Sequence, residues 1–313
     1  MPYKFKPGKM YMMPTHFGPS MGPRQGPEGR TFTCKDNPRT TSISVNFLTN
    51  REQLEALLPE RFEVGAEPVV SVSASYMKEI EWLAGRGYNI LGVSFPVVFN
   101  GEQDRAKGGF LTVLWENLCD PILTGREQLG FSKIYCELPE PTVLHGETCC
   151  IASWLGFKFM DIKLTNMVSV PLDPSPLSAT EEPSEGVLKG TLHYKYIPRT
   201  GEWNCADVGH AVLTPAEGSN SVIKETWQGD GTVEFHRARW EDLPTQYHIV
   251  NTLHELEVKE YRGASIVKSF GDKYSGRLLK KAKYRTILWL LVSSTTVRQN
   301  FLAIHLRAQT LNI

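Results

Sequence analysis

Segments rich in β-branched and aromatic residues follow one another at short spacing through most of the chain, and this pattern constrains the fold more than any other feature. Val, Ile, Thr, Phe, Tyr and Trp favour strands, and Gly, Pro or Asn separates the segments. The candidate strands are residues 41–49, 68–76, 88–99, 108–117, 143–159, 162–170, 190–198, 210–229, 231–240 and 253–261. Parallel pairing would need crossover connections of about a dozen residues or more, and few are available. We therefore predict an α+β protein, mainly antiparallel β, folded as a β-barrel or cone with a few short helices.

Two short segments have a helical pattern. Asn50 is the expected N-cap of the first helix, and Leu54, Leu57 and Leu58 are spaced to form its buried stripe. The second candidate helix covers residues 243–254, after which strand-like alternation is expected to resume.

The distribution of prolines and charges divides the chain into three parts. Residues 1–39 contain seven prolines, which disfavour long helices and central strands, so we expect an irregular N-terminal arm. Residues 40–270 hold the predicted β domain. Residues 271–313 form a basic and apolar extension with no acidic residue after Asp272. We expect a packed terminal helix or an oligomer contact there, with a membrane-surface helix as the less favoured alternative.

Composition excludes several classes of function. The 34 basic and 34 acidic residues balance, so bulk charge indicates no nucleic-acid partner. The longest apolar stretch, residues 287–292, is far shorter than the roughly 20 residues of a membrane-spanning helix. The N-terminus lacks the apolar region of a secretory signal, and the six cysteines show no paired spacing. We predict a cytoplasmic protein with reduced thiols and no membrane partner. The C-terminal extension is the one segment for which a membrane-surface helix is the alternative.

Common catalytic and cofactor motifs are missing. The sequence contains no GxGxxG, P-loop, HExxH or GxSxG element, and its eight histidines are scattered singly. No Cys or His cluster has zinc-ligand spacing. We therefore expect neither a metal nor a cofactor.

Lys133 is the residue that stands out, because it lies in the otherwise apolar, small-residue end of residues 120–135. Burial disfavours an ammonium and lowers its pKa, which turns a lysine into a nucleophile. From an ordinary pKa near 10.4, a drop to about 7 would leave about half of the amine neutral at pH 7. A lysine that extends from a strand end to solvent is the alternative interpretation.

At this point the chain resembles the acetoacetate decarboxylase family. The resemblance is carried by GREQLGFSK at residues 125–133, in which Lys133 falls on the family's Schiff-base lysine. Residues 47–64, residues 95–101 and the segments IKETWQGDGTVEF and WEDLP near the end of the domain also resemble the family. The similarity covers roughly residues 40–270.

The resemblance implies an acetoacetate-decarboxylase-like β-barrel or cone, homo-oligomers, and a lysine activated by desolvation or by a neighbouring cation. In the decarboxylase a second lysine follows the first, whereas this chain has Ile134. The decarboxylase's two acidic site positions fall near Ser73 and near Asn89 or Ile90. Activation of Lys133 is therefore expected to come from desolvation or from a more remote cation.

Residues 79–89, EIEWLAGRGYN, resemble a divergent branch of the same superfamily that includes aldolase-dehydratase and cyclase-like enzymes of secondary metabolism. Glu81 is the predicted general acid/base, because its apolar neighbours would raise the pKa of its carboxyl group. A solvated glutamate at a strand end is the alternative.

Four further residues are candidates for substrate binding. Arg24 and Arg39, on or next to the arm, could bind a substrate carboxylate, and Tyr88 and Tyr261 could donate phenol hydrogen bonds.

The sequence thus predicts a cofactor-free Schiff-base lyase that acts on a small oxo acid through Lys133, by decarboxylation or by aldol condensation and dehydration. The alternative is a non-catalytic ligand-binding or scaffold protein of the same fold.

Overall fold

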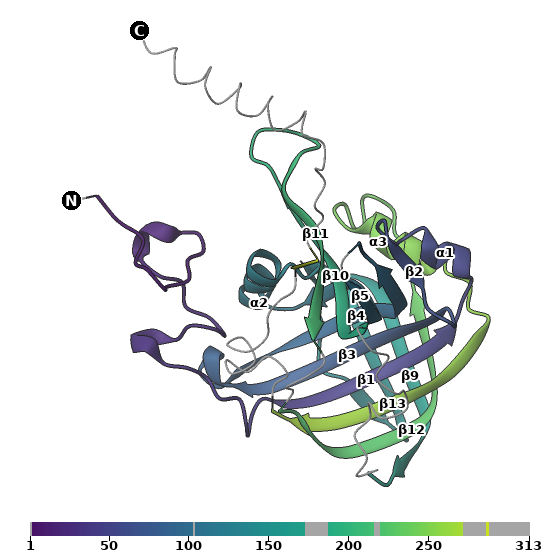
Figure 1. Cartoon of the computed structure of the whole chain (residues 1–313). Coiled ribbons are helices and arrows are strands. Elements are labelled where there is room, and N and C mark those ends of the chain that lie inside the picture. The colour runs from purple at the N-terminus through teal and green to yellow at the C-terminus, as the bar shows by residue number, and fades with distance from the viewer. Residues whose placement is uncertain (1, 103, 173–186, 216–219, 272–285, 288–313) are drawn as a thin grey trace.

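The computed structural model describes residues 2–102, 104–172, 187–215, 220–271 and 286–287 (Figure 1). Most of the predicted C-terminal extension and residues 173–186 lie outside the described residues. None of the helices in the described ranges is long and apolar enough to cross a membrane.

The regular elements are mostly strands. The strands are β1 (Arg39–Leu48), β2 (Phe62–Val64), β3 (Val69–Ile80), β4 (Arg86–Asn100), β5 (Arg105–Glu116), β6 (Lys133–Tyr135), β7 (Thr142–Leu144), β8 (Glu147–Trp154), β9 (Phe157–Val170), β10 (Val187–Pro198), β11 (Ala206–Pro215), β12 (Val222–Phe235), β13 (Glu260–Phe270) and β14 (Thr286–Ile287). The helices are α1 (Arg51–Glu55), α2 (Cys119–Thr124) and α3 (Tyr247–His254), with 3₁₀ turns η1 (Thr15–Phe17), η2 (Pro27–Gly29) and η3 (Glu81–Leu83) and the π-helical turn η4 (Gly125–Leu129).

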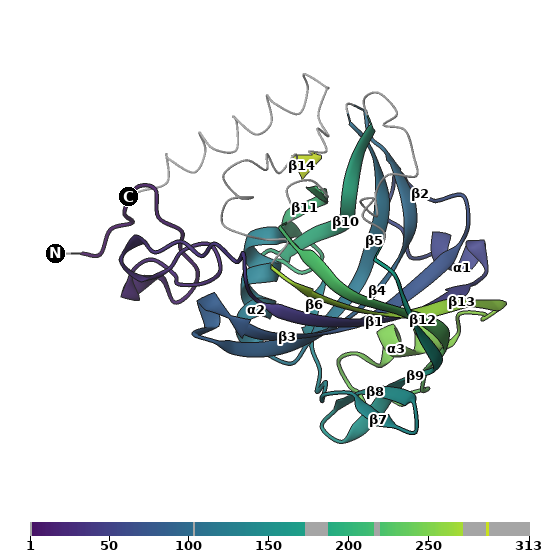
Figure 2. The ribbon, with the colours of Figure 1, turned by 90° about the horizontal axis from the view of Figure 1, so that it is seen from below.

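The strands form one strongly curved sheet (Figures 1 and 2). Its order is β14-β11-β10-β5-β4-β3-β1-β13-β12-β9-β8-β7, with β2 added to β4 and β6 added to β5. Within the described residues this path has two ends and does not close on itself. Most neighbours are antiparallel, which confirms the predicted fold class.

Side chains alternate between the two faces of the sheet, as strand geometry requires. On β1 the side chains of Ile43, Val45 and Phe47 are buried in the main core. The intervening Ser44 and Asn46 lie on the other face, where Ser44 Oγ is 2.8 Å from Ser265 Oγ on β13. The alternation read from residues 41–49 therefore specifies which face of the sheet is buried.

Two strand pairs are parallel, and both involve β5. β10 pairs with the first half of β5, and the three-residue β6 pairs with its end. The connection from β5 to β6 runs through α2 and η4, so a short helical crossover returns the chain alongside the strand that it left. This crossover carries the segment GREQLGFSK and was not predicted as helical.

The helix α1 begins where the sequence predicts, but it ends at Glu55, before Leu57 and Leu58. The Asn50 side chain accepts a hydrogen bond from Glu52 N at 2.9 Å, which caps the first turn. Leu54 is fully buried, and Leu57 and Leu58 pack against the core.

The strand predicted over residues 253–261 is wrong. Its first two residues end α3, a segment without regular structure follows, and β13 begins at Glu260. Leu253, in α3, and Leu256, just after it, are both buried, and burial of residues three apart does not fit the alternation of a strand. The two strands predicted over residues 210–240 also differ, because one long strand, β12, joins the end of the first to the beginning of the second.

Candidate active site

The segment between β5 and β6 positions Lys133. Helix α2 passes directly into the π-helical turn η4, which ends at Gly130 in the left-handed conformation with φ 82°. A Cβ atom at residue 130 would lie 2.5 Å from Lys195 Cβ on β10, so a glycine is required both by conformation and by space. The chain then turns into β6, whose first residue is Lys133.

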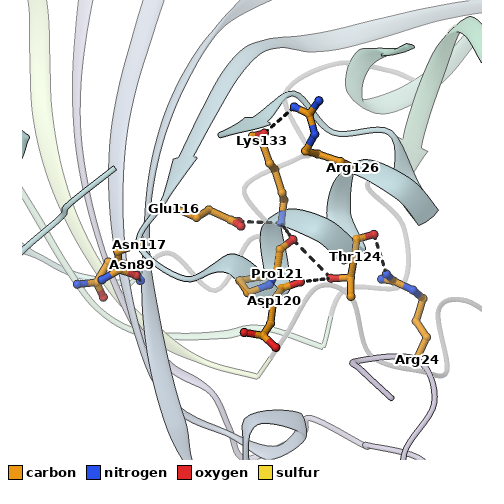
Figure 3. A network of polar contacts seen from close by, with 9 residues as sticks. All are labelled: Arg24, Asn89, Glu116, Asn117, Asp120, Pro121, Thr124, Arg126 and Lys133. Carbon is orange, nitrogen blue, oxygen red and sulfur yellow. Dashed lines mark hydrogen bonds and ion pairs between the residues drawn. The ribbon is translucent and has the colours of Figure 1, made fainter. Parts of the chain in front are cut away.

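The parallel pairing of β6 with β5 brings a carboxylate to this lysine. Leu114 pairs with Lys133 in the register, and Glu116 follows two residues later on the same face of β5. Glu116 Oε1 lies 2.7 Å from Lys133 Nζ, and the side chains are 0% and 10% exposed, respectively (Figure 3). The two groups therefore form a buried ion pair.

The remaining contacts hold the lysine side chain in place. Lys133 Nζ donates a hydrogen bond to the Pro121 carbonyl at 3.2 Å, and the ring centroid of Phe131 lies 5.7 Å from Nζ. Arg126 Nη1 donates to the Lys133 carbonyl at 2.8 Å (Figure 3). A Cβ atom on Gly125 would lie 2.4 Å from Lys133 Cδ, so η4 contacts the lysine stem directly. The amine is thus enclosed by the crossover that precedes it.

The electrostatics of Glu116 are set by burial. Burial raises the pKa of its carboxyl group, and attraction to Lys133 opposes that rise. Within the described part of the chain, the carboxylate accepts no hydrogen bond of regular geometry, so its contact with Lys133 is an ion pair. A buried carboxylate with few partners readily accepts a proton. Proton transfer from Lys133 to Glu116 would leave a neutral amine beside a neutral acid.

Ile134 lies on β6 directly after Lys133 and packs against the main core. Successive strand residues point to opposite faces. The position at which the decarboxylase carries a second lysine therefore faces away from Lys133 Nζ in this chain.

Of the sequence-predicted binding residues, Tyr88 shares a face of the sheet with Glu116, and Arg24 contacts the crossover that carries Lys133. Tyr88 is two residues along β4 from Ile90, which pairs with Glu116, so Tyr88 is on the same face of the sheet as Glu116. Arg24 Nε donates to Gln128 Oε1 at 2.7 Å, and its Nη2 donates to the Thr124 carbonyl at 3.3 Å (Figure 3). The N-terminal arm is thereby attached to α2 and η4.

Glu81 and Arg39 lie outside the segment between β5 and β6. Glu81 is part of η3, the turn between β3 and β4, where it is partly exposed. Arg39 forms an exposed ion pair with Glu79 at 3.1 Å and lines a cavity of about 600 Å³ whose lining includes neither Lys133 nor Glu116.

Tyr261 donates a hydrogen bond to the Val233 carbonyl at 3.1 Å. It lies nine residues along β13 from Phe270, the partner of Arg39, which is about 30 Å of strand. The structure does not bring Arg39 and Tyr261 together.

Glu116 is the site residue that sequence reasoning missed. The signal available was a carboxylate at the end of the predicted apolar strand over residues 108–117. From sequence, an acidic residue at that position is interpreted as a solvated side chain at a strand end. Only the return of the chain through α2 and η4 shows that it is covered. Lys133, by contrast, is predicted by its apolar surroundings and its motif, and the structure buries it.

In the residues that the structure describes, no group of three or more His, Cys, Asp or Glu side chains is arranged to hold a metal ion.

Comparison with known proteins identifies relatives of the whole domain. A sequence model of the acetoacetate decarboxylase family matches residues 12–278. No protein with a curated description shows significant sequence similarity.

Several solved structures share the fold. An acetoacetate decarboxylase is 18% identical with a TM-score of 0.57, covering 74% of this chain and 85% of its own. The acetoacetate decarboxylase of Legionella pneumophila is 21% identical with a TM-score of 0.53, covering 79% and 91%. The enduracididine biosynthesis enzyme MppR, complexed with the condensation product of pyruvate and imidazole 4-carboxaldehyde, is 16% identical with a TM-score of 0.53, covering 80% and 94%.

Proposed function

Because the chain belongs to the acetoacetate decarboxylase family, we propose that it is a Schiff-base lyase that acts on an oxo acid through Lys133, without a cofactor. Family membership supports lyase chemistry of this type. The particular reaction and substrate depend on the residues of this chain. The observation that carries the proposal is the buried contact of 2.7 Å between Lys133 Nζ, on the family motif, and Glu116 Oε1.

The first step is activation of the amine. Lys133 transfers a proton to Glu116, whose carboxyl pKa is raised by burial, and the neutral amine attacks the carbonyl carbon of the substrate. The resulting carbinolamine loses water, for which Glu116 returns the proton to the departing hydroxyl, and an iminium forms. Glu116 thus serves both as base and as acid, in place of the neighbouring cation used by the decarboxylase.

The iminium then accepts electrons from the adjacent carbon. With a 3-oxo acid, the bond to the carboxylate breaks, carbon dioxide leaves, and an enamine remains that is protonated and hydrolysed. With a 2-oxo acid, a base removes a proton from the carbon next to the iminium, and the enamine adds to an aldehyde. We propose Glu116 and Glu81 as the candidates for these proton transfers.

Binding of the substrate carboxylate is assigned to an arginine. Arg24 lies next to α2, and its guanidinium already donates to this segment. We propose Arg24 and Tyr88 as the binding residues nearest to Lys133, and Arg39 and Tyr261 as residues of more distant parts of the sheet. The arm over residues 1–39 would then close the site from one side.

The experiment is a product screen. The purified protein is incubated with 3-oxo acids such as acetoacetate, and with 2-oxo acids such as pyruvate in the presence of aldehydes. Carbon dioxide, aldol and dehydration products are measured. The proposal is supported if the wild-type protein turns over any of these substrates and Lys133→Arg does not, since arginine supplies no neutral amine. Turnover that survives in folded Lys133→Ala removes the Schiff-base mechanism.

The alternative is a non-catalytic ligand-binding or scaffold protein. The observation that favours it is the same ion pair, because a carboxylate 2.7 Å away also stabilises Lys133 as an ammonium. An unreactive Lys133 across the whole screen would support this alternative.

We propose a cytoplasmic homo-oligomer in which the extension over residues 271–313 contributes an intersubunit contact. Light scattering of the full chain and of a chain ending at residue 271 tests this assignment through the oligomer mass.

A further inference from the structure

A buried histidine contacts the loop that carries Lys133. His193, on β10, has 0% exposure, and its Nδ1 lies 3.0 Å from the Gly130 carbonyl. Its ring stacks on Phe131 with centroids 4.2 Å apart and an interplanar angle of 25°. His193 therefore touches two of the three residues that immediately precede Lys133.

The hydrogen bonds determine which ring nitrogen carries the proton. A carbonyl only accepts, so Nδ1 must donate to Gly130. Nε2 of the neutral ring is then an acceptor, and the Thr214 hydroxyl, 3.4 Å away on β11, can donate to it. Burial lowers the pKa of His193 to about 4, and the nearby His210 and Lys195 act in the same direction, so the ring is neutral at pH 7.

Phe131 transmits this contact to the amine. One side of its ring meets His193, and its centroid lies 5.7 Å from Lys133 Nζ. The Phe131 carbonyl also accepts a hydrogen bond from Lys133 N at 2.8 Å. The approach of Nζ to Glu116 therefore depends on where Phe131 is held.

We propose that His193 is a positioning residue for Lys133, acting through Phe131 and the Gly130 carbonyl to keep the amine against Glu116. This inference rests on the proposed function, because positioning matters only if Lys133 reacts. The two parts of the histidine have separate roles: the ring holds the Phe131 ring in position, and the Nδ1–H holds the Gly130 carbonyl of the turn.

The test separates these two parts. His193→Phe keeps an aromatic ring and removes the donor, whereas His193→Asn keeps a donor and removes the ring. Thr214→Val is a milder variant that leaves the histidine in place and removes the hydroxyl that can donate to its Nε2. His254→Asn is the matched control, since His254 Nδ1 makes a similar contact of 2.6 Å with the Phe235 carbonyl at a different place in the fold.

The measurement is the rate of borohydride-trapped adduct formation with pyruvate or acetoacetate as a function of pH, with folding checked by circular dichroism. We expect both His193 variants to form the adduct at least tenfold more slowly, and Thr214→Val a few-fold more slowly. Looser packing admits water to the amine, so the midpoint of the pH profile should move upward. His254→Asn should match the wild type in rate and midpoint.

Wild-type rates and midpoints in the folded variants would overturn the positioning role while leaving the proposed function intact, provided that Lys133→Ala forms no adduct. A loss of rate equal to that of His254→Asn would also overturn it, because the effect would then be general destabilisation. Absence of adduct in the wild type would overturn both the inference and the proposed function.

Discussion

Lys133 Nζ and Glu116 Oε1 lie 2.7 Å apart at the junction of two parallel strands, with the Glu116 side chain fully buried. Removing one member of a buried ion pair leaves the other charge uncompensated and typically costs about 3–5 kcal/mol. Tests of either residue therefore need a variant in which both charges are absent. Lys133→Met combined with Glu116→Gln supplies that control for stability.

Glu116→Gln should separate adduct formation from turnover. The amine remains, but the ammonium loses its counter-charge in a buried site, so the neutral form is favoured and the midpoint of adduct formation should move to lower pH. Turnover should fall by about 10²- to 10⁴-fold, the usual contribution of general acid/base catalysis. Product formation over time measures turnover, and borohydride trapping across a range of pH measures the midpoint of adduct formation. An unchanged midpoint together with normal turnover would remove Glu116 from the chemistry.

Glu81→Gln tests the acid/base residue predicted from the sequence. The trapped adduct should persist while turnover falls by about 10²-fold or more, because the carboxyl group would act after the iminium forms. Glu63→Gln, an exposed change on β2, is the control. Equal turnover in Glu81→Gln and the control would assign Glu81 to the η3 turn alone and leave the proton transfers to Glu116.

Gly125→Ala should disable the amine by steric contact. The added Cβ would lie 2.4 Å from Lys133 Cδ and 2.8 Å from Nζ, closer than real atoms approach, so the lysine must move. We expect adduct formation to slow by at least tenfold. Gly109→Ala is the control, because a Cβ there meets its nearest atom only at 3.8 Å. Normal trapping by Gly125→Ala would show that the lysine stem adapts at no cost.

The unfolding free energy should depend on pH through His193. Its pKa is lowered from 6.5 to about 4 in the folded protein, so between these values the unfolded chain binds more protons. Stability from this group is fully present above pH 6.5 and is lost as the pH falls to about 4, by roughly 3 kcal/mol in all. Urea unfolding at pH 7, 5.5 and 4.5 measures the decline. His193→Phe should remove this part of the decline, and an equal slope in both proteins would contradict the assignment.

The sheet could be predicted because strand patterns are local. The alternation over residues 41–49 places Ile43, Val45 and Phe47 on one face without any knowledge of their partners. The segment from Leu253 to Tyr261 resembles a strand in sequence because its apolar residues also alternate with polar ones, although Leu253 lies at the end of a helix and Leu256 follows it in an irregular segment.

The candidate site was predictable only in part. Lys133 is anomalous within its own segment, and the motif around it is specific. Glu116 is seventeen residues away in sequence, and its approach to Lys133 depends on the parallel register of β5 and β6, which no local pattern encodes. His193 is farther still, on a strand that joins the sheet by a second parallel pairing with β5.

The most direct test of the account is the identity of the residue that reacts with an oxo acid. The full chain is incubated with pyruvate and with acetoacetate, reduced with borohydride, and analysed by intact mass and peptide mapping, alongside Lys133→Ala and the control Lys195→Arg. With pyruvate, the account predicts a mass increase of one substrate minus one water plus two hydrogens. With acetoacetate, it predicts the same sum, less one carbon dioxide if the iminium decarboxylates before reduction. In both cases the adduct should be located on Lys133, present in Lys195→Arg and absent in Lys133→Ala. An adduct on a different lysine, or one that persists in folded Lys133→Ala, would contradict it.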